Sequence, residues 1–131
     1  MNALETAIYA KLTGDTTLMA LVGAVCNGIV PRGQTLPVCL LQPMSGIEEN
    51  VSPNDAIRYV YLVKGIARSK ATAMSIAERA STLLHKSTLT VTGWNNFWTA
   101  RTNYVSYVEI DPAQPSENIY HVGWEYVIRL A

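Results

Sequence analysis

The clearest hydrophobic pattern of the chain lies in its last segment, residues 119–130. Every even position there is apolar, whereas the odd positions include His121, Glu125 and Arg129. Alternation with a period of two predicts a β-strand with one buried face, and aromatic and β-branched side chains suit that surface. We expect the odd face to meet solvent or a neighbouring subunit. The even face, expected in the core, consists of Tyr120, Val122, Trp124, Tyr126, Ile128 and Leu130.

Helical spacing elsewhere in the chain predicts what covers this strand. Residues 69–85 place apolar side chains at intervals of three and four, with Ser69 as the N-cap. The alanine-rich stripe of this helix should let it lie close to a sheet. Residues 3–12 predict a first helix with Asn2 as its N-cap, and residues 16–22 predict a short one that ends at a glycine.

The remaining apolar segments predict strands. Residues 37–44 and 57–66 are strand-like, and the second is apolar on both faces, which suggests a position inside the sheet or at a subunit contact. Residues 89–91 predict a brief strand, and residues 99–110 alternate again and form a hairpin with the last strand. A proline-containing loop at residues 111–116 joins the two. The order of elements predicts an α+β fold, with a mostly antiparallel sheet of about four strands and helices packed on one face.

Two further connections have polar or turn-forming sequences. Residues 45–55 form the most polar part of the chain, and they contain Glu48, Glu49 and Asp55. We expect an exposed acidic connection there. The segment that follows Gly23 runs through Asn27, Gly28, Pro31, Arg32 and Gly33, and these turn residues argue against regular structure there.

Composition and charge indicate one domain, residues 1–131, with no bulk attraction to nucleic acid or membrane. Ten basic and ten acidic residues give zero net charge. Charged residues make up only 15% of the chain, which suggests that other subunits cover part of the surface. We find no convincing signal peptide and no apolar run that would span a bilayer. Cys26 and Cys39 are therefore expected to be reduced and buried in the cytoplasm.

Candidate catalytic and metal-binding residues are few. His121 and Glu125 lie on the same strand face, and such a pair could do acid–base chemistry, although a solvated cross-strand contact is far commoner. The two cysteines and two histidines lack the short spacings of a zinc site. No nucleophile elbow, phosphate-binding loop or EF-hand is present. We assign no catalytic, cofactor-binding or metal-binding residue.

Two further groups have alternative interpretations. Trp94, Phe97 and Trp98 could bind a ligand, anchor an interface or fill the end of the core. Four basic residues could meet DNA phosphates or form an ordinary solvated edge. These are Arg58, Lys64, Arg68 and Lys70.

With these elements in order, the chain resembles the tail-completion family of long-tailed bacteriophages, which includes tail terminators and tail-to-head joining proteins. Three features in the first part of the chain are similar to landmarks of that family. They are a leucine-rich turn that ends at Gly23, the following Ile29 and Pro31, and Leu36 with Pro37 before a strand. A strand-to-helix unit and an aromatic closing strand extend the resemblance over nearly the whole chain. Their residues are Tyr59, Tyr61, Val63, Ala67, Ser69, Ala73, Ile76, Ala77, Leu83, Leu84, Ile119, Tyr120, Trp124, Tyr126 and Ile128.

The resemblance implies a structural protein without enzymatic activity or cofactor. Its relatives form hexameric rings that cap the finished tail tube, stop its polymerisation and present a surface to the head connector. DNA later passes through the lumen without sequence-specific binding. The expected partners are other copies in a homohexamer, the tail-tube protein and the head connector or stopper protein, with no membrane. The location would be the tail or neck of the virion, assembled in the host cytoplasm.

We expect the polar connections and the basic residues near them to provide the interface or lumen. The candidate residues are Glu48, Glu49, Asp55, Arg58, Arg68, Lys70, Gln114 and Glu117. Two alternatives remain. A head-side adaptor or stopper of the neck would bind connector protein, and a small ligand-binding domain or enzyme would use His121, Glu125 and the tryptophans in a pocket between sheet and helix.

Overall fold

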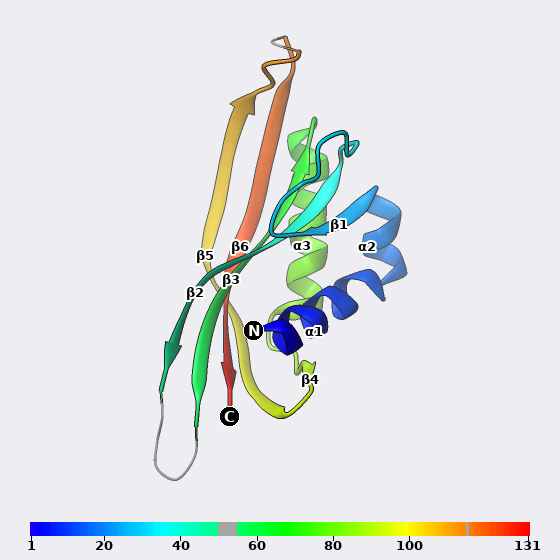
Figure 1. Ribbon diagram of the computed structural model, residues 1–131. Coiled ribbons are helices and arrows are strands. Elements are labelled where there is room, and N and C mark those ends of the chain that lie inside the picture. Colours follow the sequence, from blue (N-terminus) through cyan, green and yellow to red (C-terminus); the bar gives the residue numbers. More distant parts are fainter. Residues whose placement is uncertain (50–54, 115) are drawn as a thin grey trace.

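Four long antiparallel strands, flanked by two short ones, form a curled sheet with three helices packed on one face (Figure 1). The computed structural model describes residues 1–49, 55–114 and 116–131. The order in the sheet is β1-β2-β3-β6-β5-β4. The helices are α1 (Asn2–Thr13), α2 (Thr16–Leu21) and α3 (Lys70–Leu84), and the strands are β1 (Ala24–Asn27), β2 (Val38–Glu48), β3 (Ile57–Ala67), β4 (Thr90–Val91), β5 (Trp94–Ile110) and β6 (Asn118–Leu130).

The prediction of helices on a mostly antiparallel sheet is confirmed, but the prediction of about four strands is wrong, because the sheet has six. The four long strands lie where the sequence predicted them. β1 lies in the segment that we expected to be irregular, and it pairs in parallel with β2 from Ala24 opposite Val38 to Asn27 opposite Leu41. Four residues followed by a turn have no room for an alternating pattern, so β1 forms because β2 offers it an edge.

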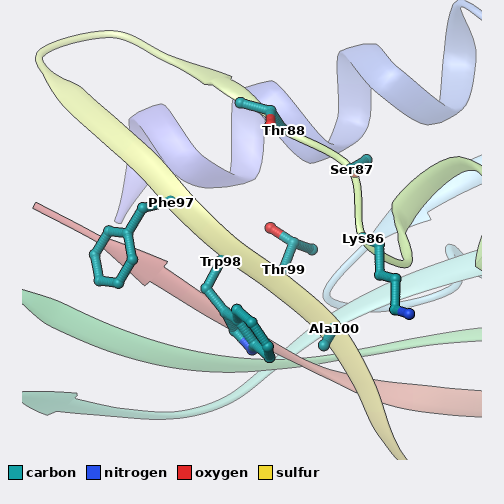
Figure 2. Close-up of a pocket in the computed structure, with 7 residues that line it drawn as sticks. All are labelled: Lys86, Ser87, Thr88, Phe97, Trp98, Thr99 and Ala100. Atoms are coloured by element: carbon teal, nitrogen blue, oxygen red, sulfur yellow. The ribbon is translucent and has the colours of Figure 1, made fainter.

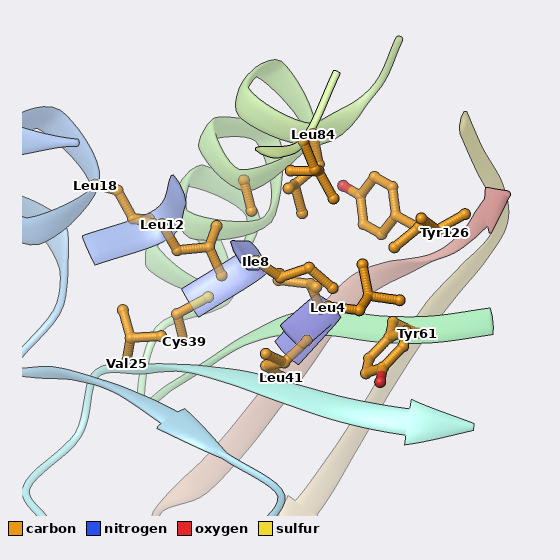
Figure 3. Packing of buried hydrophobic residues seen from close by; sticks show 14 of the residues in the cluster. Leu4, Ile8, Leu12, Leu18, Val25, Cys39, Leu41, Tyr61, Leu84 and Tyr126 are labelled. Carbon is orange, nitrogen blue, oxygen red and sulfur yellow. The ribbon is translucent and has the colours of Figure 1, made fainter. Parts of the chain in front are cut away.

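The main core lies between the helices and the sheet (Figure 3). Leu4, Ile8 and Leu12 project from α1 at helical spacing, and all three are fully buried. They meet side chains of the long strands, including Tyr61 and Tyr126. Burial of each leucine or isoleucine contributes about 1.5–3 kcal/mol to folding. Helix α1 is therefore a structural part of the domain, although its sequence signal was modest.

Strand β6 lies between β3 and β5, and its even face is in the core as predicted. Val122, Tyr126, Ile128 and Leu130 are each at most 1% exposed. The prediction for the odd face is wrong at His121, which is 7% exposed. The side chains of Tyr107 and Glu109 on the neighbouring strand β5 contact His121 and cover its ring.

Helix α3 lies close to β3, as its alanine stripe predicted. Gly65 in β3 has no side chain, and an added Cβ would stand 2.6 Å from the Ala73 carbonyl oxygen and 2.7 Å from the Cβ of Ile76. Ala73, Ala77 and the glycine thus let the two backbones approach. Ser69 is the N-cap by position, but its side chain makes no capping hydrogen bond.

Element boundaries differ from the predictions at three places. Helix α1 begins at Asn2, with Met1 in the N-cap position. Strand β2 continues to Glu48, so the first part of the expected 45–55 connection is paired with β3, for example Gly46 with Tyr59. Strand β5 begins at Trp94 and therefore includes the aromatic segment. The rest of the connection at residues 50–54 lies outside the described residues.

Candidate assembly interface

Two hairpins extend beyond the helical layer at opposite ends of the sheet (Figure 1). One is formed by β5 and β6, and the other by β2 and β3. On β5, all residues from 102 to 110 are exposed except the half-buried Val105. On β2, residues 43–48 are all exposed. We call these two segments the β5 edge (residues 102–110) and the β2 edge (residues 43–48).

Both edges carry large apolar side chains in contact with solvent. On the β5 edge, Tyr104 and Tyr107 are about half exposed, and Val108 and Ile110 are 54% and 67% exposed. Met44 and Ile47 on the β2 edge are 52% and 51% exposed. A group of exposed apolar side chains on one element is characteristic of a protein–protein contact rather than of a free surface. These edges are the strongest candidates for an interface.

The predicted acidic residues lie at the end of the sheet where β2 and β3 project. Glu49 pairs with Arg58 at 3.5 Å and approaches Arg129 of β6 at 4.0 Å. Glu48 and Asp55 are exposed at the same end. Because these side chains remain accessible to water, each ion pair adds little to folding. The group can meet a partner at little desolvation cost.

The other predicted residues gather at the opposite end, where β5 and β6 meet. Arg68 pairs with Asp111 at 2.7 Å and with Glu117 at 3.4 Å. The hydrogen bond from Arg68, followed by one from the Ala113 amide, lowers the pKa of Asp111 below its ordinary value. Gln114 donates its backbone N–H to the Asp111 carbonyl. This network fastens the start of the 111–117 turn to the end of β3.

The eight predicted interface residues therefore form two groups instead of one site. Arg58 and Arg68 mark the two ends of β3, which places them about 34 Å apart at the usual rise of a strand. Lys70, at the start of α3, is exposed near the Arg68 end. Lys64, the remaining basic residue of the proposed DNA-facing set, is only 5% exposed. The four basic residues do not form one surface.

A polar cluster links β3, β6 and β5 on the face of the sheet away from the helices, with His121 and Lys64 buried and Tyr107 and Glu109 about half exposed. His121 Nε2 lies 2.6 Å from Glu109 Oε1, and its ring stacks on Tyr107 at 4.4 Å between centroids. Lys64 Nζ donates a 2.7 Å hydrogen bond to the Tyr107 hydroxyl. Burial lowers the pKa of His121, and the hydrogen bond with Glu109 opposes this effect. The His121–Glu125 pair that the sequence left open is not seen, since His121 contacts Glu109 and Glu125 accepts a hydrogen bond from Asn103.

A hollow of about 400 Å³ lies where the α3–β4 connection runs beside β5 (Figure 2). Phe97 and Trp98 contribute to its wall and are 52% and 56% exposed. Trp94 instead packs partly against the core. Of the three interpretations of the aromatic segment, core filling therefore holds for Trp94 alone. Phe97 and Trp98 are surface residues that could contact a partner.

Comparison with known proteins identifies the family of the chain. A family model described as tail completion protein gp17 matches residues 6–108, which is most of the chain. The chain belongs to this family. It is thus a structural protein of the bacteriophage tail and a component of the virion.

A solved structure has the same fold over almost the full length of this family member. It is a chain of the virion of a native gene transfer agent particle, with 18% sequence identity and a TM-score of 0.77. The match covers 98% of this chain and 96% of that chain. No curated protein matches the sequence.

The cysteines and histidines of this family member do not converge. Cys39 lies in the main core, whereas Cys26 belongs to a second cluster on the other face of the sheet. His85 lies at the end of α3, and His121 lies within β6. Within the described parts of the chain, no three metal-ligating side chains come together, and no helix there is long and apolar enough to cross a membrane.

Sequence reasoning missed the β5 edge because it treated apolar alternation as evidence of burial, and it missed the β2 edge because residues 45–48 were expected to form an exposed connection and not a strand. The sequence did contain a signal. Residues 104–110 have apolar side chains on both faces, namely Tyr104, Val105, Tyr107, Val108 and Ile110. The same criterion indicated an internal strand or a subunit contact for residues 57–66, and for β5 the second alternative would have been the better interpretation.

Proposed function

We propose that the protein forms a ring at the head-proximal end of the tail, where it terminates polymerisation of the tail tube and provides the surface that joins the head. Membership of the tail completion family supports this role. The single observation that carries the ring is the pair of apolar, exposed edges on opposite sides of one sheet. Two different surfaces on one subunit favour head-to-tail contacts, which close into a ring when the rotation permits.

The two charged groups suit the two axial contacts of such a ring. The group around Glu48, Glu49 and Arg58 lies at one end of the sheet, and the group around Arg68, Asp111 and Glu117 lies at the other. If the strands run from one face of the ring to the other, one end of the sheet meets the tail-tube protein and the other end meets the head connector or stopper. Charged groups at the edge of an interface determine the orientation of the partner and the choice of partner more than the affinity.

The proposal is of a single domain without catalytic activity or cofactor. The cluster of His121, Glu109, Tyr107 and Lys64 is a group of mutually bonded side chains, and none of the four lines the hollow beside β5. DNA would pass through the lumen of the ring without sequence-specific contacts.

Complementation of tails tests this function directly. Purified protein is added to tails that were assembled without it, and tube lengths and head joining are measured by electron microscopy and plaque assay. We expect tubes of one fixed length that are competent to join heads. No effect on tubes or heads would contradict the proposal. Binding to connector protein alone, without control of tube length, would instead identify a head-side stopper.

A further inference from the structure

We infer that consecutive copies of the chain join by strand pairing, with the β5 edge of one copy hydrogen-bonded to the β2 edge of the next. This inference rests on the proposed ring and specifies the contact that holds it together. The occupant of each edge is a second copy of this chain. Four observations support the pairing. They concern the uncovered outer sides of the two strands, the scarcity of residues that protect edges, the direction of the strands and the register between them.

No described strand covers the outer side of either edge. Strand β1 covers β2 only from Val38 to Leu41, and β4 pairs with β5 only at Trp94 and Asn95. Further along β5, Arg101 donates its N–H to the His85 ring. In the described part of the chain, no strand pairs with the outer side of β5 over residues 102–110 or with that of β2 over residues 43–48. Each segment is long enough for several main-chain hydrogen bonds.

The two edges carry few of the features that normally prevent strand addition, and each has a register shift only at one end, between Arg101 and Tyr104 on β5 and between Pro43 and Ser45 on β2. Exposed edges of monomeric proteins are usually blunted by lysine, proline or an inward-facing charge. Residues 102–110 contain no lysine and no proline, and their one charged residue, Glu109, is bonded to His121. Pro43 stands only at the start of the β2 edge, next to a register shift between Pro43 and Ser45. Such a long apolar edge on a structural protein is expected to be covered by a partner.

The direction of the strands fits a repeated antiparallel contact. The four long strands alternate in direction across the order β2-β3-β6-β5, because each adjacent pair is antiparallel. The two outer strands of this set, β2 and β5, therefore run in opposite directions. A rotation that places one copy beside the next brings β5 of the first antiparallel to β2 of the second, and the alternation continues from copy to copy.

The register of the sheet predicts a stagger between copies. Ser106 lies in the middle of the β5 edge and pairs with Val122, which pairs with Gly65, which pairs with Cys39. Ser106 and Cys39 therefore lie at the same height across the sheet. The middle of the β2 edge, at Ser45, lies six residues further along. Six residues correspond to about 20 Å along a strand, and four strands are about 19 Å wide. Pairing the edges thus inclines the strands by about 45° to the ring axis, close to the 35–45° of closed barrels.

The simplest alternative is a symmetrical contact of one edge with itself. Each edge is blocked at a different end: β1 covers the β2 side near Val38, and the α3–β4 connection covers the β5 side near Thr99, whose carbonyl accepts the Lys86 N–H. The open parts of the two edges therefore lie at opposite ends of the sheet and meet between copies at the stagger given above, whereas a self-paired edge would leave the other edge uncovered. This complementarity favours a heterologous contact that repeats around a ring.

Disulfide trapping tests the pairing at the level of residues. Ser45 of the β2 edge and Val105, Tyr107 and Glu109 of the β5 edge all lie on the face of the sheet away from the helices. Ser45→Cys is combined in turn with a cysteine at each of the three β5 positions, because directly opposed residues approach closely enough for a disulfide. Native Cys26 and Cys39 are buried and stay in place. Oxidation is carried out with protein alone and with protein bound to purified tail tubes.

We expect at least one double variant to give a ladder of covalent oligomers above the dimer. Each single variant should stay at the wild-type background, and an equimolar mixture of Ser45→Cys with the matching β5 variant should stop at dimers. Circular dichroism establishes that each variant is folded. If wild-type protein forms rings or caps tubes and no ladder appears, strand pairing is wrong and the ring stands. If wild-type protein does neither, the proposed function fails as well.

Lysine substitutions give a second, independent measurement. Ile47→Lys disables the β2 edge and Ile110→Lys disables the β5 edge, and both side chains are more than half exposed, so folding should be unaffected. Each variant alone should remain monomeric under conditions where wild type forms rings, and the two mixed should form dimers. Ile29→Lys is the matched control, since Ile29 is 75% exposed and lies on neither edge. Oligomers of Ile47→Lys alone would overturn the heterologous pairing.

Discussion

At the scale of single residues, Asp15 and Arg79 form a close ion pair with two hydrogen bonds. The Asp15 carboxylate accepts hydrogen bonds from the Leu18 amide at 2.8 Å and from two nitrogens of Arg79 at 2.7 and 2.8 Å. It therefore caps α2 and ties that helix to α3. The bonds from Arg79, and then the bond from the amide, lower the pKa of Asp15 to about 2.

This contact predicts a loss of stability in acid. A carboxylate whose pKa is depressed on folding contributes its stabilisation above its ordinary pKa of 3.8 and loses it as pH falls toward about 2. Asp15→Asn retains a side chain that can cap the helix but removes the charge beside Arg79. The difference in urea midpoint between wild type and variant should be largest above pH 4 and shrink below it. Asp55→Asn, at an exposed residue, is the control.

His121 predicts a second dependence on pH, near neutrality. Burial lowers its pKa, so the folded protein disfavours the imidazolium more than the unfolded chain does. Stability should therefore fall as pH drops below the ordinary histidine pKa of about 6.5. Glu109, Tyr107 and Lys64 are the titratable groups in contact with one another around the ring.

The measurement compares urea midpoints at pH 7.5 and 5.5 for wild type, His121→Gln and His85→Gln. His121→Gln should reduce the loss on acidification. His85→Gln serves as a comparison, because burial and the neighbouring charge of Arg101 lower the pKa of His85 as well. An unchanged pH dependence in His121→Gln would show that the buried ring does not carry the effect.

At the scale of elements, the sequence predicted those whose pattern is long and one-sided. Strand β6 and helix α3 could be located because their apolar positions repeat over many residues. Strand β1 could not, since it has four residues and depends on β2 for its pairing. The extensions of β2 through Ser45 and Gly46 and of β5 through Asn95 and Asn96 were missed for a related reason, because residues typical of turns there are held in strands by their neighbours.

The packing of α1 on the sheet gives a matched pair of substitutions. Ile8 is fully buried, and Ile8→Ala should lower the free energy of unfolding by about 2–5 kcal/mol. Tyr9, the next residue, is 42% exposed, and Tyr9→Ala should change it by less than about 0.5 kcal/mol. Urea denaturation followed by circular dichroism measures both. Equal effects would mean that α1 does not use the face seen in the structure.

At the scale of the whole molecule, the sequence did not predict how the candidate interface residues are arranged on the sheet. Residues in the polar connections do lie at the ends of the sheet, but Arg58 and Arg68 are on different ends. Net charge and loop position cannot reveal which end of a sheet a residue occupies, because that depends on strand order. Apolar exposure on β5 was not predicted either, because apolar residues on both faces of residues 104–110 indicate either an internal strand or an edge that meets a partner, and the pattern alone does not separate the two.

The most direct test of the proposed function is to locate the protein in intact tails by cryo-electron microscopy. The account predicts one ring of copies at the head-proximal end of the tube, with the strands of neighbouring copies in continuous pairing across each subunit boundary. Density for this fold along the whole tube, at the distal tip or only within the head would contradict it.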